Sequence, residues 1–221
     1  FIPIVERKLS HPGEGELTLI ASEHEAEANV TGWSVGPLQF GKFLTAIFDE
    51  WVRGDVSEFF VQIFDVSLES WYRGAASLCV FQETCGLALA LEHNGDLYSC
   101  DHYVYPQNRL GNIMQEPLAE LVDSEFQRQF GMRKKEALPA YCLKCRFLAA
   151  CRGECPKHRF LRTPDGEPGL NYLCKGYKHY FSHVPPYMEF MVEELGRGQA
   201  PANVMKWVHD QEEKKAGKRR P

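Results

Sequence analysis

Eight cysteines constrain this chain more than any other feature of its 221 residues. They lie in two closely spaced groups and one later position, Cys79-x5-Cys85-x14-Cys100, Cys142-x2-Cys145-x5-Cys151-x3-Cys155 and Cys174. Eight thiolates divide into two sets of four, and four thiolates complete the ligand shell of one tetrahedral zinc ion or one iron–sulfur cube. The spacing therefore predicts a metal-binding framework and by itself leaves zinc and iron–sulfur open.

Two other roles of cysteine fit the sequence less well. Free cysteine can serve as a small buried hydrophobe, but the segment from Cys142 to Cys155 is not an apolar core pattern. Disulfides stabilise short secreted chains, whereas 221 residues with 44% hydrophobic content can bury a core without them. We expect no signal peptide, and eight thiols then indicate the reducing cytoplasm.

Charge and hydrophobicity exclude two classes of partner. The net charge is −5 and the basic residues form no stripe before the C-terminal tail, so we expect no nucleic-acid binding. No apolar run approaches the length of a membrane-spanning helix, so we expect no membrane association.

Hydrophobic periodicity predicts a mixed fold of helices and strands, of the α/β or α+β class. Short apolar runs predict strands at Phe1–Glu6 and Phe59–Phe64, with an acidic loop between them that reaches about Val35. Apolar residues at helical spacing predict helices at 37–51, 117–130, 172–183 and 186–195, and a Pro/Gly loop at 162–169.

A hairpin is predicted around Asn94-Gly95, because apolar residues alternate on both sides of this turn dipeptide. The two arms of the hairpin would carry Cys85 and Cys100. Residues far apart in the chain would in this way reach one metal site.

The order of the cysteines resembles a known domain. Cys85, Gly95-x4-Cys100, Cys142-x2-Cys145-x5-Cys151-x3-Cys155 and Cys174 resemble the seven-cysteine signature of the SPASM domain, the auxiliary-cluster extension of radical S-adenosylmethionine (SAM) enzymes. Cys79 gives the eight-cysteine version, which, with Asp101 directly after Cys100, resembles the anaerobic sulfatase-maturating enzymes. The flanking segments at 1–6, 41–51 and 172–177 are similar to that family as well, so the resemblance extends from residue 1 to about Trp207.

One motif of that family is absent from the sequence. The SAM-binding cluster of radical SAM enzymes needs a Cys-x3-Cys-x2-Cys loop, and the nearest match, Cys151-x3-Cys155, has His158 at the third position. With Phe1 in place of a methionine, we expect a C-terminal fragment that is inactive alone. We expect residues 1–75 to be the end of a partial (β/α) barrel, 76–183 the SPASM domain, 184–208 a helical segment and 209–221 a charged, disordered tail.

The resemblance implies two auxiliary [4Fe-4S] clusters and their ligands. One cluster would take Cys79, Cys85, Cys100 and Cys155, and the other would take Cys142, Cys145, Cys151 and Cys174. Every iron would then have a protein ligand, which suits electron transfer or a structural role better than substrate binding at iron. His158 is left out, because the cysteines already fill both shells.

Asp101 is the remaining candidate. As an isolated residue it fits a turn or cap, but in the resembled family an aspartate here is the proposed general base that takes the proton from the substrate Cys or Ser. His102, Tyr103 and Tyr105 could line the same site or simply pack.

The resemblance also implies the activity of the whole enzyme. SAM and a third [4Fe-4S] cluster in the N-terminal part would generate the radical, and a sulfatase Cys or Ser would become formylglycine. The partners would be a sulfatase polypeptide and a one-electron carrier such as flavodoxin or ferredoxin. Two alternatives remain: another SPASM enzyme that forms thioether or carbon–carbon links in peptides, and a zinc-stabilised binding module.

Overall fold

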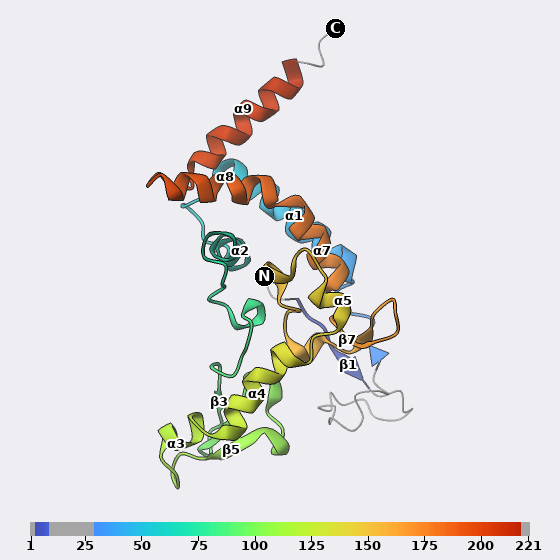
Figure 1. Ribbon diagram of the computed structural model, residues 1–221, viewed down its shortest axis with the longest axis vertical. Coiled ribbons are helices and arrows are strands. Elements are labelled where there is room, and N and C mark those ends of the chain that lie inside the picture. Colours follow the sequence, from blue (N-terminus) through green and yellow to red (C-terminus); the bar gives the residue numbers. More distant parts are fainter. Residues whose placement is uncertain (1–2, 9–28, 218–221) are drawn as a thin grey trace. The chain divides into compact units, whose positions relative to one another are not determined.

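The computed structural model describes residues 3–8 and 29–217, which form helices and short strands as the α/β prediction requires (Figure 1). They belong to two compact units. Unit 1 consists of Phe1–Pro3, Val35–Ser77 and Leu173–Pro221, and unit 2 consists of Ile4–Ser34 and Leu78–Tyr172.

Unit 1 is helical in its described part. Its helices are α1 (Pro37–Gly54), α2 (Gln62–Arg73), α7 (Cys174–His183), α8 (Pro185–Gly196) and α9 (Asn203–Gly217). Proline at the first position of α1 and α8 lacks the N–H that a first turn would leave unbonded, so both helices begin where the sequence predicts. The break that the two prolines predict between α7 and α8 is present.

Aromatic side chains fill the core of unit 1. Phe48 of α1 is fully buried, and its ring lies 5.2 Å from that of Phe64 on α2 and 6.1 Å from that of Tyr180 on α7. Tyr180 is also fully buried, and its hydroxyl donates to Ser67 Oγ at 3.1 Å, so its polar atom has a partner inside the core.

Two glycines let α1 and α7 pack backbone against backbone. A Cβ at Gly176 would clash with the carbonyl of Pro37, and a Cβ at Gly41 would lie 2.5 Å from the carbonyl oxygen of Gly176. Both clashes involve main-chain atoms, which cannot rotate away as a flexible side chain could. Only glycine fits at either position.

Unit 2 is built from short elements joined by turns. Its helices are α3 (Leu118–Val122), α4 (Glu125–Glu136), α5 (Ala140–Leu143) and α6 (Leu148–Cys151), with 3₁₀ turns η2 (Cys79–Phe81), η3 (Asp101–Tyr103), η4 (Pro106–Asn108) and η5 (Pro156–His158). Its strands form three antiparallel sheets: β1 (Arg7–Lys8) with β2 (Asn29–Val30), β3 (Ala90–Leu91) with β4 (Asp96–Tyr98) and β5 (Arg109–Asn112), and β6 (Leu161–Arg162) with β7 (Pro168–Leu170).

The predicted hairpin is confirmed as β3 and β4, with Leu91 opposite Leu97. Gly95 in its turn has φ +88°, a conformation that glycine adopts without strain. Strand β5 extends the sheet on the far side of β4, and the Arg109 guanidinium pairs with Asp96 at 2.6 Å. Cys85 lies before β3 and Cys100 follows β4. The antiparallel hairpin between them reverses the direction of the chain, so residues before and after it lie at the same end of the hairpin.

Two predicted strands are wrong. Residues 3–6 have no regular structure, and Ile4 is 58% exposed; β1 begins only at Arg7. The run at 59–64 enters α2 at Gln62, and Phe59 and Phe60 remain 67% and 82% exposed. Short apolar runs do not distinguish a strand from the start of a helix, because the periodicity becomes visible only over a longer segment.

The helix predicted at 117–130 is two helices. Ser124 interrupts it, because its Oγ accepts from the N–H of Gln127 at 3.3 Å and so caps the start of α4. The apolar face expected there is therefore divided: Leu121 and Phe130 are buried, whereas Phe126 is 42% exposed.

Two further segments are more regular than predicted. The loop predicted at 162–169 connects β6 and β7, which pair with each other, and includes residues of both strands. The tail predicted from residue 209 is helical as far as Gly217, where α9 ends. Within unit 1, Arg53 of α1 forms an ion pair with Glu212 of α9 at 3.0 Å, which holds this part of α9 against α1. The acidic loop at 9–28, residues 1–2 and the tail end at 218–221 lie outside the described residues.

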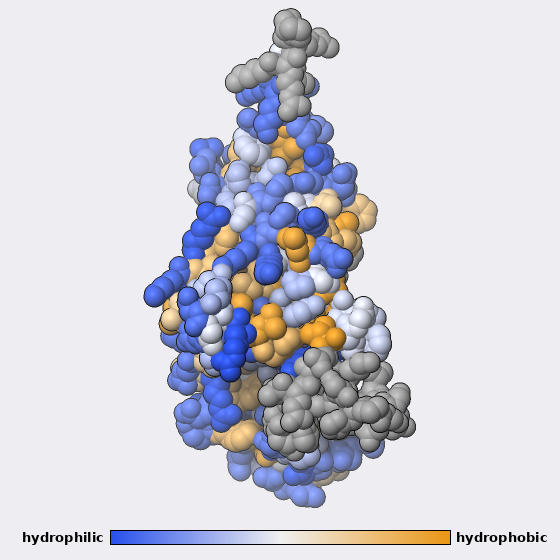
Figure 2. Space-filling model, turned by 90° about the vertical axis from the view of Figure 1, so that its right-hand side faces the viewer, coloured by the Kyte–Doolittle hydropathy of each residue, from blue (hydrophilic) through white to orange (hydrophobic). Residues whose placement is uncertain are grey.

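The surface shown in Figure 2 is largely hydrophilic, with hydrophobic residues in several separate patches. Among the helices in the described ranges, none has the length and hydrophobicity needed to cross a lipid bilayer.

Substituting Gly176→Ala should lower the free energy of unfolding by about 1–3 kcal/mol, because the new methyl group overpacks the contact with α1. Gly54→Ala on α1 is the matched control, since a Cβ there meets no atom within 4 Å. Chemical denaturation followed by circular dichroism measures both. Equal stability of the two variants would contradict the close helix contact.

Candidate metal centre

One face of α4 is buried in unit 2 and is mostly polar. Gln127, Phe130, Gly131 and Lys134 are the buried residues of this helix. Spacings of three and four residues place them in one row along the helix. This row contacts all three upstream segments that carry cysteines.

Gln127 joins the segments on either side of the hairpin. Its side-chain Nε2 donates to the carbonyl oxygen of Gly86 at 2.6 Å and to that of Ser99 at 3.1 Å. Gly86 follows Cys85, and Ser99 precedes Cys100. One buried amide therefore fixes the backbone next to both cysteines.

Gly131 allows the Cys85 backbone to approach the helix. The N–H of Cys85 donates to the carbonyl of Gly131 at 3.2 Å, and a Cβ at Gly131 would clash with the carbonyl oxygen of Cys85. A larger residue here would push the Cys85 segment away from α4.

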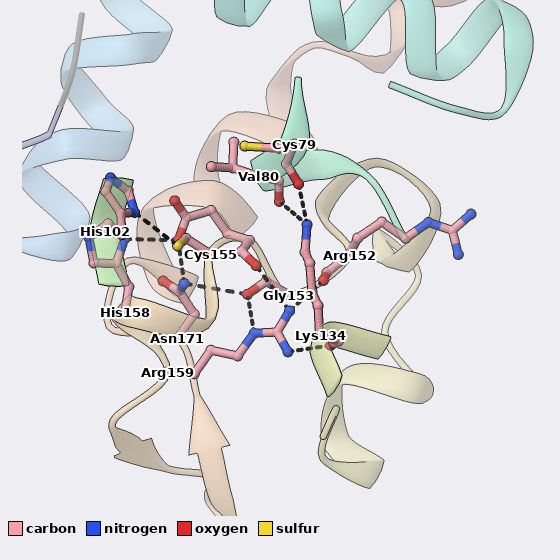
Figure 3. A network of polar contacts seen from close by, with 11 residues as sticks. Cys79, Val80, His102, Lys134, Arg152, Gly153, Cys155, His158, Arg159 and Asn171 are labelled. Atoms are coloured by element: carbon pink, nitrogen blue, oxygen red, sulfur yellow. Dashed lines mark hydrogen bonds and ion pairs between the residues drawn. The ribbon is translucent and has the colours of Figure 1, made fainter. Parts of the chain in front are cut away.

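Lys134 holds the third segment. Its ammonium donates to the carbonyl oxygens of Cys79 and Val80 in η2, the latter at 2.9 Å, and the residue is 1% exposed (Figure 3). Residues 127, 131 and 134 of one helix thus position the segments of Cys79, Cys85 and Cys100.

Cys155 comes from the downstream motif and joins this group. Its Sγ lies 3.2 Å from Nδ1 of His102, two residues after Cys100 (Figure 3). The neighbouring Asp101 accepts at Oδ1 from the Cys100 Sγ at 3.1 Å and from the N–H of His102 at 3.0 Å. Asp101 itself is exposed to solvent.

The pKa values also indicate that these four cysteines form one group. Burial, with contributions from the charges of Glu154 and Cys100, raises the pKa of Cys155 to about 12. Burial likewise raises the pKa of Cys100 to about 12, with a contribution from Cys85, and the pKa of Cys85 is raised by burial and by Cys79. Raised pKa values keep the thiols of Cys85, Cys100 and Cys155 protonated without a metal, and metal binding would displace their protons.

The second group of cysteines lies on tight turns. Cys142 belongs to α5, and its carbonyl accepts from the N–H of Cys145 at 3.0 Å; Cys151 ends α6. Cys174 is the first residue of α7 and belongs to unit 1. None of the eight cysteines forms a disulfide.

The loop between Cys151 and Cys155 is unusual in its backbone. Arg152, Gly153 and Glu154 have φ values of +48°, +70° and +51°, a left-handed conformation that is costly for residues other than glycine. The Arg159 guanidinium stabilises this loop, because it donates to the carbonyl oxygens of all three residues at 2.8–2.9 Å (Figure 3).

The side chain of Glu154 is buried inside the same loop. It accepts from Asn171 Nδ2 at 2.6 Å and lies 2.9 Å from His158 Nδ1. This contact gives His158 a hydrogen-bond partner within the loop. Tyr103 packs edge-on against Phe130, and Tyr105 is buried beside Lys157.

The donor set fits iron–sulfur clusters. Reduced, partly buried cysteines on glycine-containing turns are the ligands that such a cluster requires.

Comparison with known proteins agrees with this chemistry. The model of the SPASM family, described as an iron-sulfur cluster-binding domain, matches residues 73–146. The matched span contains five of the eight cysteines, Cys79, Cys85, Cys100, Cys142 and Cys145.

A serine-type anaerobic sulfatase-maturating enzyme of Bacteroides thetaiotaomicron is 52% identical over 210 residues, which are 95% of this chain and 50% of that protein. The chain is a homologue of the anaerobic sulfatase-maturating enzymes. A cysteine-type enzyme of this family from Clostridium perfringens is 32% identical over 70% of the chain and 42% of its own length. The chain thus spans about half the length of the curated relatives it matches.

Solved structures of the family have the same fold. The structure of native anSMEcpe with bound AdoMet and the Cp18Cys peptide matches with a TM-score of 0.66 and 29% identity, over 75% of this chain and 46% of that one. The predicted fold, a SPASM domain joined to part of a radical SAM enzyme, is confirmed at this level.

Sequence reasoning missed the residues that hold the cysteines in place. Gln127, Gly131 and Lys134 were not predicted, because polar residues in a helix are normally solvated, and Arg159 follows a short turn with no pattern of its own. The available signal was a glycine and a lysine within the helical row of Phe130, where apolar residues would be expected. A single sequence does not indicate which of those polar side chains is buried.

Substituting Gln127→Leu should leave two buried carbonyls without a donor, at about 1–3 kcal/mol for each. We expect a lower iron content in anaerobically prepared protein, because the segments of Cys85 and Cys100 would separate. Gln129→Leu is the matched control, since Gln129 is exposed on the same helix and its Nε2 donates to Glu125 Oε1. Equal iron content in the two variants would contradict the role of Gln127.

Proposed function

We propose that this chain is the auxiliary-cluster portion of a radical SAM oxidoreductase that converts a sulfatase Cys or Ser to formylglycine. The observation that carries this proposal is the convergence of Cys79, Cys85, Cys100 and Cys155 beside Asp101 in a homologue of the sulfatase-maturating enzymes. Generation of the radical from SAM, with its own [4Fe-4S] cluster, would belong to the remaining half of the enzyme.

The eight cysteines would hold two [4Fe-4S] clusters. The first set would be Cys79, Cys85, Cys100 and Cys155, and the second would be Cys142, Cys145, Cys151 and Cys174. Proximity in unit 2 supports the first set. The turn in which the N–H of Cys145 bonds the carbonyl of Cys142 supports two members of the second set, and the family resemblance supports Cys151 and Cys174.

With four cysteines for each cluster, no iron would be open to substrate. The chemistry that such clusters supply is one-electron transfer. The chain's own contribution to the reaction would then be to bind them, to exclude water from their sulfurs and to handle a proton nearby.

Asp101 would handle that proton. Its carboxylate lies next to Cys100 and is exposed, so a substrate side chain can reach it. Removal of two electrons from the substrate carbon–oxygen or carbon–sulfur unit also requires loss of the hydroxyl or thiol proton, and a carboxylate at this position can accept it.

The proposed substrate is a sulfatase polypeptide, and a one-electron carrier such as flavodoxin or ferredoxin would receive the electron. Eight cysteines that serve as thiolate ligands would need a reducing compartment, for which we propose the cytoplasm.

In the full-length enzyme, Asp101→Asn should lower formylglycine formation by roughly 10²–10⁴-fold, the usual effect of losing a positioned general base. Asparagine keeps the volume and the acceptor oxygen of the contact with the His102 N–H, so both clusters should still assemble. SAM cleavage should persist. Mass spectrometry of a sulfatase peptide measures the product.

Cys100→Ala, one residue away, is the comparison. It should lose iron, because it removes a ligand and leaves Asp101 in place. Wild-type turnover by Asp101→Asn would show that Asp101 is only a turn residue and that the base lies elsewhere.

A further inference from the structure

Two cationic side chains lie among the cysteines of unit 2. Lys134 is 1% exposed, and Arg159 reaches under the loop between Cys151 and Cys155 (Figure 3). The Arg159 guanidinium also donates to the carbonyl oxygen of Lys134 at 2.6 Å, so the two residues are directly connected.

Neutral carbonyl groups are the hydrogen-bond partners of both cations. Lys134 donates to Cys79 and Val80, and Arg159 donates to four carbonyl groups in all. Within the described ranges, neither forms a salt bridge with a carboxylate. A buried cation without a partner of opposite charge is strongly destabilising, so the balancing charge must come from another group.

Lys134 bonds the backbone of Cys79, and Arg159 bonds the loop between Cys151 and Cys155, so cysteine sulfurs close to both cations can supply that charge. Burial lowers the pKa of Arg159, and the charges of Cys142, Cys151 and Cys155 oppose that change. Glu154 adds one carboxylate near Arg159, but it is already bonded to Asn171 and lies against His158.

The neighbours divide between the two proposed ligand sets. Lys134 donates to the backbone of Cys79, a member of the first set, whereas Arg159 donates to the loop that joins Cys151 of the second set to Cys155 of the first. Arg159 thus lies where the two sets meet.

We propose that Lys134 and Arg159 are built-in counter-charges of the two clusters and make the clusters easier to reduce, an inference that rests on the proposed function. A cube with four thiolates is a net anion, and one added electron increases its negative charge. A buried cation therefore stabilises the reduced state more than the oxidised state. Lys134 acts on the first cluster, and Arg159 acts on both.

The test is a potentiometric titration, followed by electron paramagnetic resonance, of the natural protein purified anaerobically with its clusters. Lys134→Gln keeps a donor for the carbonyls but removes the charge. It should shift the equilibrium constant for reduction of one auxiliary cluster at least tenfold toward the oxidised state, about 59 mV for one electron. Arg159→Gln should shift both auxiliary signals in the same direction.

Two controls separate charge from shape. Lys135→Gln removes a neighbouring lysine that is 52% exposed and paired with Glu83, so the potentials should stay unchanged. Lys134→Arg keeps the positive charge and should retain the wild-type potential. If Lys134→Gln loses its clusters while Lys134→Arg keeps them, the charge is needed for assembly, which also supports the proposal.

Unchanged potentials in Lys134→Gln with full iron content would overturn the counter-charge role and leave the cluster proposal intact. Loss of clusters in both Lys134 variants would also overturn it, because a role in shape alone would explain that result. Absence of iron and sulfide from the wild-type protein would instead contradict the proposed function itself.

Discussion

The arrangement of cysteines in unit 2 depends on one buried polar face of α4. Gln127, Gly131 and Lys134 bind three separate backbone segments, and each segment carries a cysteine. Buried carbonyl groups need donors, so these contacts are costly to break. A helix that would otherwise bury apolar side chains instead supplies the donors that position a metal site.

Unit 2 has little apolar core to replace such contacts. Most of the buried hydrophobic side chains among the described residues belong to unit 1, where the rings around Phe48 pack together. The strands of unit 2 are two to four residues long. Cluster binding would therefore contribute to the folding of unit 2, since a site that forms only in the folded state links metal affinity to stability. The cations Lys134 and Arg159 and the left-handed loop at 152–154 fit a unit that would hold negatively charged clusters.

The sequence predicted features with a strong local cause. Pro37 and the period of Phe40, Leu44 and Phe48 predicted α1, and Asn94-Gly95 predicted the hairpin. The strands predicted at 1–6 and 59–64 were wrong because those apolar runs are short. The helix at 117–130 was divided by a Ser124 cap that the hydrophobic pattern does not reveal.

The ligand residues of the candidate site were predictable from the sequence, but the residues that hold those ligands in place were not. Cysteine spacing indicated the donors, and the family resemblance indicated how they divide. Gln127, Lys134 and Arg159 make long-range contacts to backbone atoms, and such contacts leave no periodic signal in one sequence.

The central claim is that eight cysteines form two four-ligand cluster sites, and metal analysis of the anaerobically prepared 221-residue chain tests it most directly. We predict about eight iron and about eight acid-labile sulfide per chain, as two cubes require. Cys85→Ser and Cys145→Ser should each disturb a different half of that content. Bound zinc with no acid-labile sulfide, or iron content unchanged by both substitutions, would contradict the account.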